Sequence, residues 1–234
     1  MLQATISADI IASSSLTSNE IDKLTKFGYH LFDVLNEYHK NNKLDKLNIR
    51  LTQGDLIECL LQNPQDALRV ALIIKTGIKS FRLEKKADTK YRKAFETYGI
   101  RVAIGLGNMD MNLVEKDILK GDAINRSGRM IADQKTSNKE RLVVKNTLFF
   151  DSPSAEHNKI FTPIMSLLDV ILNRLTRRQS EVIFWRLLGY NENETSKQLK
   201  ITQSSVNQQS RTSGWSAIEE SIALFSSFNF NTTP

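Results

Sequence analysis

Two aspartates stand at positions where carboxylates could do chemistry. Asp9 interrupts the apolar run of residues 3–11, and Asp55 follows Gly54 at the tip of a predicted hairpin. If that hairpin pairs with the first strand, both carboxylates reach one edge of the sheet and repel each other unless a proton or cation intervenes. Mg²⁺ suits this arrangement because it takes few carboxylates and completes its shell with water or phosphate oxygens. The alternative is local, with Asp55 serving the turn and Asp9 capping a neighbouring group.

A second pair of polar residues lies in the segment GDAINRSGRM. Asn125 and Arg129 are four residues apart, so they share one face of the helix predicted there. An amide beside a guanidinium suits a ribose edge and a phosphate, and the guanidinium can follow charge that develops on phosphoryl oxygens. The alternative is a solvated polar helix face.

The elements that must position these residues alternate along residues 1–150. Buried-strand patterns cover residues 3–11, 100–107 and 140–145, and a hairpin joins residues 47–52 to 56–61. Helical periodicity covers residues 17–38, 63–81 and 121–133. This order predicts an α+β domain with a mostly antiparallel sheet and with helices on one face.

The pattern changes after residues 151–154, where strand signals stop. Residues 151–175 are predicted to be a linker with a connecting helix over residues 163–175, and Thr176 with Gln179 forms a capping box. Residues 176–234 form short helices with tight turns, as in a helix-turn-helix domain, with the second helix at about 192–199 and the recognition helix at about 203–211. The residues predicted to face DNA are Gln203, Ser204, Ser205, Asn207, Gln208 and Arg211. Gln and Asn read adenine in the major groove, and Ser contacts phosphates.

The charge distribution limits the DNA-binding prediction. Residues 151–234 carry eight basic and eight acidic side chains, so the net charge of +6 lies entirely in residues 1–150. A neutral domain releases few counterions from DNA unless dimerisation or clustering gathers its basic residues on one face. The alternative is a structural or protein-docking helical unit.

Composition excludes several classes of protein. The 234 residues hold no apolar run long enough to span a membrane, and the first residues lack the basic region of a secretory signal. A single cysteine, Cys59, cannot form an intrachain disulfide and indicates a reducing, cytoplasmic setting. We therefore expect a cytoplasmic protein with no membrane partner.

The segments ADIIAS, RLTQGD, RVAIGLG and GDAINRSGRM together resemble the class III nucleotide cyclase catalytic domain. The resemblance implies a ferredoxin-like, cyclase-type sandwich in which Asp9, Ile10 and Asp55 hold Mg²⁺ or Mn²⁺. It also implies that Asn125 and Arg129 stabilise the transition state from the other subunit of a head-to-tail homodimer. Two metal ions would then activate a ribose 3′-hydroxyl for displacement of pyrophosphate.

The chain departs from that family at the nucleotide-binding positions. The base-reading Lys expected three residues before Gly54 is Leu51, and the second base-reading position falls on Ile118, or on Asp117 after a shift of one residue. The identity of the nucleotide therefore stays open.

The whole chain resembles SatD-like bacterial proteins, which join a diverged cyclase-like domain to a C-terminal helix-turn-helix. The segments that carry this resemblance are LTRRQSEVI and TQSSVNQQSRTSGW. It implies this two-domain architecture, which together with the changed base-reading positions favours a transcription regulator that binds a nucleotide and a metal in residues 1–150 and DNA in residues 176–234. The alternative is an active cyclase that converts a nucleoside triphosphate into a cyclic mononucleotide, with the C-terminal helices serving docking or control.

Overall fold

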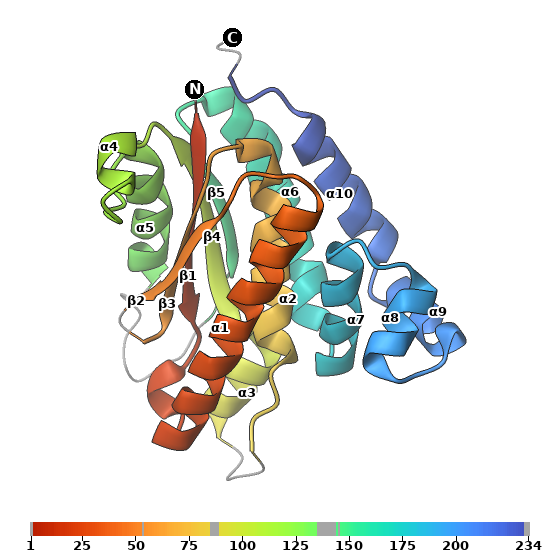
Figure 1. The fold of residues 1–234 in the computed structure, drawn as a ribbon. Coiled ribbons are helices and arrows are strands. Elements are labelled where there is room, and N and C mark those ends of the chain that lie inside the picture. Colours follow the sequence, from red (N-terminus) through yellow and green to blue (C-terminus); the bar gives the residue numbers. More distant parts are fainter. Residues whose placement is uncertain (1, 53, 85–88, 135–143, 145, 232–234) are drawn as a thin grey trace.

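A five-stranded sheet forms the centre of the molecule in the computed structural model, which describes residues 2–52, 54–84, 89–134, 144 and 146–231. The strand order is β2-β3-β1-β4-β5, and only the β4–β5 pair is parallel (Figure 1). The strands are β1 (Gln3–Ile10), β2 (Asn48–Thr52), β3 (Leu56–Leu61), β4 (Ile100–Gly107) and β5 (Leu148–Asp151). A mixed, mostly antiparallel sheet with helices confirms the predicted fold class at this level. The strand predicted at 140–145 lies outside the described residues except for Val144.

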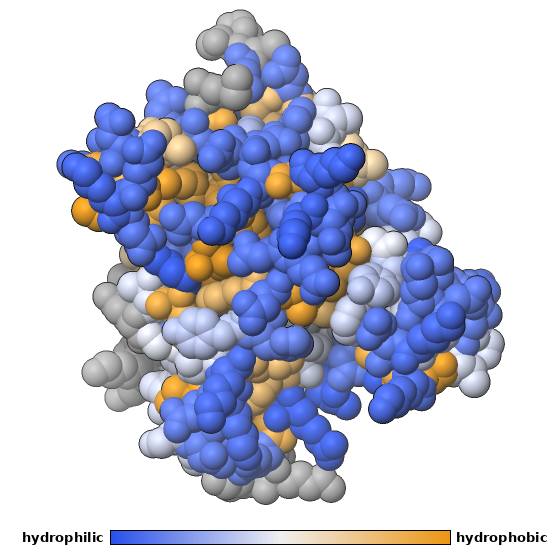
Figure 2. Space-filling view, in the orientation of Figure 1, coloured by the Kyte–Doolittle hydropathy of each residue, from blue (hydrophilic) through white to orange (hydrophobic). Residues whose placement is uncertain are grey.

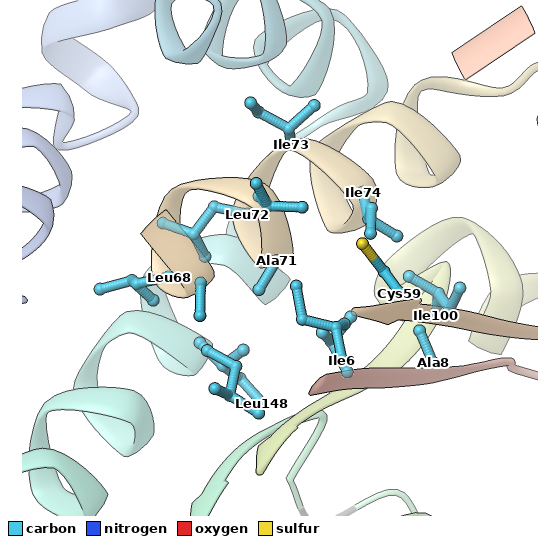
Figure 3. Packing of buried hydrophobic residues seen from close by; sticks show 14 of the residues in the cluster. Ile6, Ala8, Cys59, Leu68, Ala71, Leu72, Ile73, Ile74, Ile100 and Leu148 are labelled. Atoms are coloured by element: carbon cyan, nitrogen blue, oxygen red, sulfur yellow. The ribbon is translucent and has the colours of Figure 1, made fainter. Parts of the chain in front are cut away.

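Helices α1 (Ser18–Asn41) and α2 (Ala67–Ser80) belong to one face of the sheet, and α3 (Lys90–Tyr98) lies beside α2. Figure 3 shows Ile6 and Ala8 of β1 packed with Cys59 and Ile100 under α2, where Ala71 approaches them. Because side chains alternate along a strand, the even-numbered residues of β1 face this core. The burial of large apolar side chains here holds α2 against the sheet.

Helix α5 (Asp122–Gln134) covers the other face, which corrects the prediction that helices lie on one face only. The hydroxyls of Thr5 and Ser7 lie 2.9 and 2.8 Å from the Ser127 hydroxyl, so the odd-numbered side of β1 is buried and polar. A Cβ at Gly105 would lie 2.4 Å from the carbonyl oxygen of Ala123. Glycine therefore lets the helix backbone lie directly on β4.

Capping residues set several helix starts where the sequence predicts them. Complete capping boxes begin α1 at Thr17, α7 (Arg177–Leu187) at Thr176 and α8 (Glu192–Leu199) at Asn191. In each box the cap side chain and a Glu or Gln three residues later satisfy backbone N–H groups that the helix leaves unpaired. The predicted capping box at Thr176 is confirmed.

The C-terminal helices pack on the same core as the sheet. They are α6 (Ala155–Arg174), α7, α8, α9 (Gln203–Thr212) and α10 (Trp215–Ser227), and α7 lies along α2. Phe161 of α6, Phe225 of α10 and Phe230 surround Phe150 of β5 with ring centroids 5.4–6.4 Å from it. The predicted boundary at residue 150 falls inside β5, and α6 begins eight residues before the connecting helix predicted from residue 163.

A buried polar cluster joins α2 to α6. Lys75 Nζ donates to the hydroxyl of Thr147 at 2.5 Å and lies 3.6 Å from Asp169 of α6. Lys79 Nζ donates to the carbonyls of Leu172 and Asn173, at 2.7 and 2.9 Å, in the last turn of α6. Burial lowers the pKa of Lys75 to about 8, and burial together with the charge of Lys75 lowers the pKa of Lys79 to about 7.

A short helix, α4 (Met111–Val114), precedes α5. None of the helices in the described part of the chain combines the length and the apolar character that crossing a bilayer requires.

Candidate functional site

The tip of the β2–β3 hairpin lies beside the end of β1. Gly54 adopts a φ of +80°, which a side chain would disfavour, and the backbone N–H of Ile10 donates to the Asp55 carbonyl at 3.1 Å. Ser13, in the short 3-10 helix η1 (Ser13–Ser15), donates its hydroxyl to Asp55 Oδ2 at 2.8 Å. A pocket of about 300 Å³ opens here between the hairpin tip, η1 and α1. Three predicted site residues, Ile10, Gly54 and Asp55, line it.

Asp9 faces away from this pocket. Its backbone pairs with Leu56 and Arg101 on the two neighbouring strands, and its side chain belongs to the odd-numbered side of β1 that faces α5. Arg101 Nη1 lies 3.0 Å from Asp9 Oδ2, and both side chains are largely buried. A guanidinium of the same sheet therefore supplies a positive charge beside Asp9.

This arrangement bears on the predicted metal site. Within the described residues, no three His, Cys, Asp or Glu side chains gather closely enough to hold a metal ion together. Asp55 accepts a hydrogen bond from Ser13 on the α1 side of the sheet, and Asp9 pairs with Arg101 on the α5 side. A divalent ion at Asp9 would have to replace or join Arg101, so the shared Mg²⁺ site of Asp9 and Asp55 stays a prediction.

The positions that correspond to base reading are divided between the two faces of the sheet. Leu51 is partly buried and packs against the core on the α1 side. Ile118 is exposed in the loop before α5, and the carbonyl of Asp117 accepts a hydrogen bond from Arg50 Nη1 at 2.8 Å. Since Arg50 and Leu51 are neighbours in one strand, their side chains point to opposite faces. Leu51 is thus not brought together with Asp117 and Ile118.

Asn125 and Arg129 are both exposed on α5, on the side that does not touch the sheet. Between them, Arg126 pairs with Asp122 and Asp151 and anchors the helix to the end of β5. In the described part of the chain, neither Asn125 nor Arg129 makes a hydrogen bond to Asp9 or Asp55. Their outward position leaves them accessible to another molecule.

Helix α9 carries all six residues predicted to contact DNA: Gln203, Ser204, Ser205, Asn207, Gln208 and Arg211. Val206 and Ser210 are buried on its inner side, and Figure 2 shows a mostly hydrophilic surface over α8 and α9. The side-chain amides of Gln203 and Asn207 both donate to the carboxylate of Glu192, in the first turn of α8. The side chains of Gln208 and Arg211 are exposed and make no hydrogen bond to other described residues.

Two residues that affect these sites, Arg101 and Glu192, were missed by the sequence prediction. Arg101 is a basic residue inside the buried-strand pattern IRVAIGLG, which was a usable signal because a buried charge needs a partner. Glu192 gave no specific signal, because acidic residues are common in the first turn of a helix. Only the packing of α8 on α9 shows that it reaches Gln203 and Asn207.

Comparisons with known proteins give one structural similarity. No protein-family model matches the chain, and no curated protein matches it significantly. A solved structure of a bacterial light-regulated adenylyl cyclase is similar, at 18% sequence identity over 63% of this chain and 74% of the other, with a TM-score of 0.37. A TM-score this low does not by itself establish a shared fold.

Proposed function

We propose that the protein is a homodimeric regulator that binds DNA through α9 and a nucleotide beside the hairpin tip. The observation that carries the DNA-binding part is the exposed pair Gln208 and Arg211, which have no partner among the described residues. They lie three residues apart on one side of α9, the helix that follows α8 after a left-handed turn at Lys200 (φ +53°). An outward amide and guanidinium suit base edges and phosphates.

The acidic residue Glu192 determines which end of α9 can contact DNA phosphates. It holds the amides of Gln203 and Asn207, so the end of α9 that begins near Glu192 carries a negative charge. Phosphates would be repelled there, whereas a cytosine or adenine amino group would be an acceptable partner. DNA would therefore be gripped mainly at the Arg211 end of α9.

Binding to a duplex selected from a randomised library tests this proposal. Fluorescence anisotropy over a range of salt concentrations should show that the double variant Gln208→Ala with Arg211→Ala weakens binding by about 10-fold or more, and that loss of Arg211 lowers the salt slope by about one. Arg174→Ala, which removes an equally exposed guanidinium at the end of α6, is the matched control. Equal affinities for the two variants would remove α9 from the DNA-binding surface.

The nucleotide part of the proposal rests on the pocket at the hairpin tip. Gly54 brings the backbone close to the pocket, and the Ser13 and Ser14 side chains of η1 line it beside Asp55. The Ser13 hydroxyl donates to Asp55 and offers a ligand its lone pairs, and the Ser14 hydroxyl lies beside it. The rest of the lining is mostly aliphatic, so it suits the base of a nucleotide better than its phosphates. Equilibrium dialysis with each of the four nucleoside triphosphates should detect binding that Ser13→Ala weakens.

An active cyclase is the second candidate, favoured by the exposure of Asn125 and Arg129 on α5. A partner subunit could present this pair to the hairpin of the first, which is the arrangement the cyclase resemblance implies. The assay mixes protein with each nucleoside triphosphate and Mg²⁺ or Mn²⁺ and measures cyclic product. A cyclic product that the wild type forms and Asp55→Asn does not would establish catalysis. Nucleotide binding without a cyclic product would favour the regulator over the cyclase.

A further inference from the structure

A second pocket lies where the C-terminal helices meet α2. It has a volume of about 350 Å³, and its lining includes Arg69 of α2, Arg186 of α7, Tyr190 of the α7–α8 connection, and Trp215, Glu219 and Ile222 of α10. We call it the junction pocket. In Figure 1, α7 lies beside α2, and α10 lies above α7 in the view.

Two guanidinium groups give the junction pocket a positive character. Arg69 donates from Nη1 to the Leu187 carbonyl at 2.9 Å, and Arg186 donates from Nη1 to the Tyr190 carbonyl at 3.3 Å. Among the described residues, neither arginine forms an ion pair with a carboxylate. Each guanidinium has five N–H groups, so both retain donors for a ligand.

Two buried nitrogens at the junction pocket lack an acceptor. Arg186 Nε and Trp215 Nε1 have no hydrogen-bond partner among the described residues, and Trp215 is only 9% exposed. The Arg186 guanidinium carbon lies 4.9 Å from the centre of the Trp215 ring, which holds the two side chains against each other. Buried N–H groups without acceptors are costly, and a ligand oxygen would reach these two nitrogens only after a small shift of the Arg186 or Trp215 side chain, because both are closed to solvent.

The charge and shape of the junction pocket narrow the class of ligand. Two arginines and the exposed carboxylate of Glu219 give a net charge that matches a singly charged anion better than a phosphate dianion. Ile222, Tyr190 and the indole of Trp215 offer an apolar wall to the rest of the molecule. We propose that the junction pocket binds a small organic carboxylate whose apolar body packs on this wall.

Such a ligand would join three parts of the fold. Arg69 belongs to the helix that packs on the sheet, Trp215 to α10, and Arg186 to the helix that leads through Gly189 and Tyr190 into α8. A bound carboxylate would therefore brace the start of α8 against α2. This inference does not depend on DNA binding by α9 or on nucleotide binding at the hairpin.

Hexanoate is a suitable probe, because it has a carboxylate and a short apolar chain and does not absorb where tryptophan does. The chain has two tryptophans, so a Trp185→Phe background makes Trp215 the only reporter. We expect a saturable change in Trp215 fluorescence with a dissociation constant of about 1 mM or lower. Acetate should bind more than about 10-fold more weakly because it lacks the apolar chain, and hexanamide should not bind because it lacks the charge.

Substitutions locate the site. Arg186→Gln and Arg69→Gln should each weaken hexanoate binding by about 10-fold or more, since each removes a charged donor. Lys159→Gln, which removes an exposed charge from α6, should leave it unchanged. If Arg186→Gln fails to fold by circular dichroism, Arg69→Gln decides, because its side chain is only partly buried.

Three results would overturn the proposal. The first is the absence of a saturable signal with hexanoate, and the second is equal binding by Arg69→Gln and Lys159→Gln. The third is tighter binding of inorganic phosphate than of hexanoate, which would contradict the assignment of a carboxylate.

Discussion

Arg101→Gln should destabilise the protein, because it removes the guanidinium that pairs with the buried Asp9 carboxylate. The two side chains are 10% and 6% exposed, and their charged atoms lie 3.0 Å apart. Removing one partner of a buried pair costs about 3–5 kcal/mol, and partial exposure at the end of β1 places this pair near 3 kcal/mol. For a chain of this size, that loss lowers the melting temperature by roughly 6–12 °C.

Urea unfolding at neutral pH in the presence of a chelator measures this loss. Arg126→Gln is the matched control, because Arg126 is likewise an arginine paired with carboxylates, and its side chain and those of its partners Asp122 and Asp151 are more exposed. Exposed pairs contribute about 0–1 kcal/mol, so the control should lose far less than Arg101→Gln. The double variant Asp9→Asn with Arg101→Gln should recover part of the loss, because it removes the buried carboxylate together with its arginine partner.

The same variant tests whether Asp9 can hold a metal. Once Arg101 is gone, Mn²⁺ should raise the stability of Arg101→Gln if Asp9 is a metal ligand, because a ligand that binds only the folded state stabilises it. Mn²⁺ should have no such effect on the double variant with Asp9→Asn. Equal losses for Arg101→Gln and Arg126→Gln would refute the buried ion pair, and no response to Mn²⁺ would remove Asp9 from the metal hypothesis.

Three further predictions concern the fold. Gly105→Ala should lower the free energy of unfolding in urea by more than about 2 kcal/mol, because its Cβ would meet the backbone of α5. A Cβ at Gly128 would have nothing within 4 Å, so Gly128→Ala should stabilise α5 by up to about 1 kcal/mol. Equal effects of the two substitutions would contradict the close packing of α5 on β4. The pKa of Lys79 falls from 10.5 to about 7 in the folded state, so the unfolded chain binds more protons between these two pH values. The free energy of unfolding should therefore rise with pH across that window. Lys79→Met should reduce this rise, and an unchanged pH dependence would exclude Lys79 as its source. Lys200→Gly should raise the melting temperature slightly, since glycine adopts the φ of +53° without strain, and a lower melting temperature would contradict that backbone geometry.

Local signals in the sequence predicted much of the fold. Side-chain alternation and the Gly54-Asp55 turn located the hairpin, and polar caps such as Thr176 marked helix starts. These features depend on residues a few positions apart, so the chain encodes them locally. The placement of α5 on the second face is not encoded locally. It depends on how Gly105 of β4 meets the α5 backbone 18 or more residues later in the chain.

The candidate site was less predictable for the same reason. The turn Gly54-Asp55 was located from the sequence, but its place beside β1 was only conditional, and the direction of the Asp9 side chain depends on the pairing register. The register places Asp9 beside Arg101, a residue 92 positions away, and the turn lets Asp55 meet Ser13 instead. A one-residue shift in register would exchange the faces, and no local pattern fixes that choice.

Helix α2 is the element through which the proposed sites can influence each other. Its inner side packs on β1 and β4, Lys79 donates to the last turn of α6, and Arg69 lines the junction pocket. Because nearly all of α2 is buried, it moves as a rigid body or not at all, and small shifts in a close-packed interior are transmitted rather than absorbed. A ligand at the hairpin tip and a ligand in the junction pocket would then be coupled only if α2 has two positions that differ in their affinity for both. If α2 has two such positions, a carboxylate in the junction pocket would favour one of them, because the pocket contacts α2, α7 and the connection to α8 together.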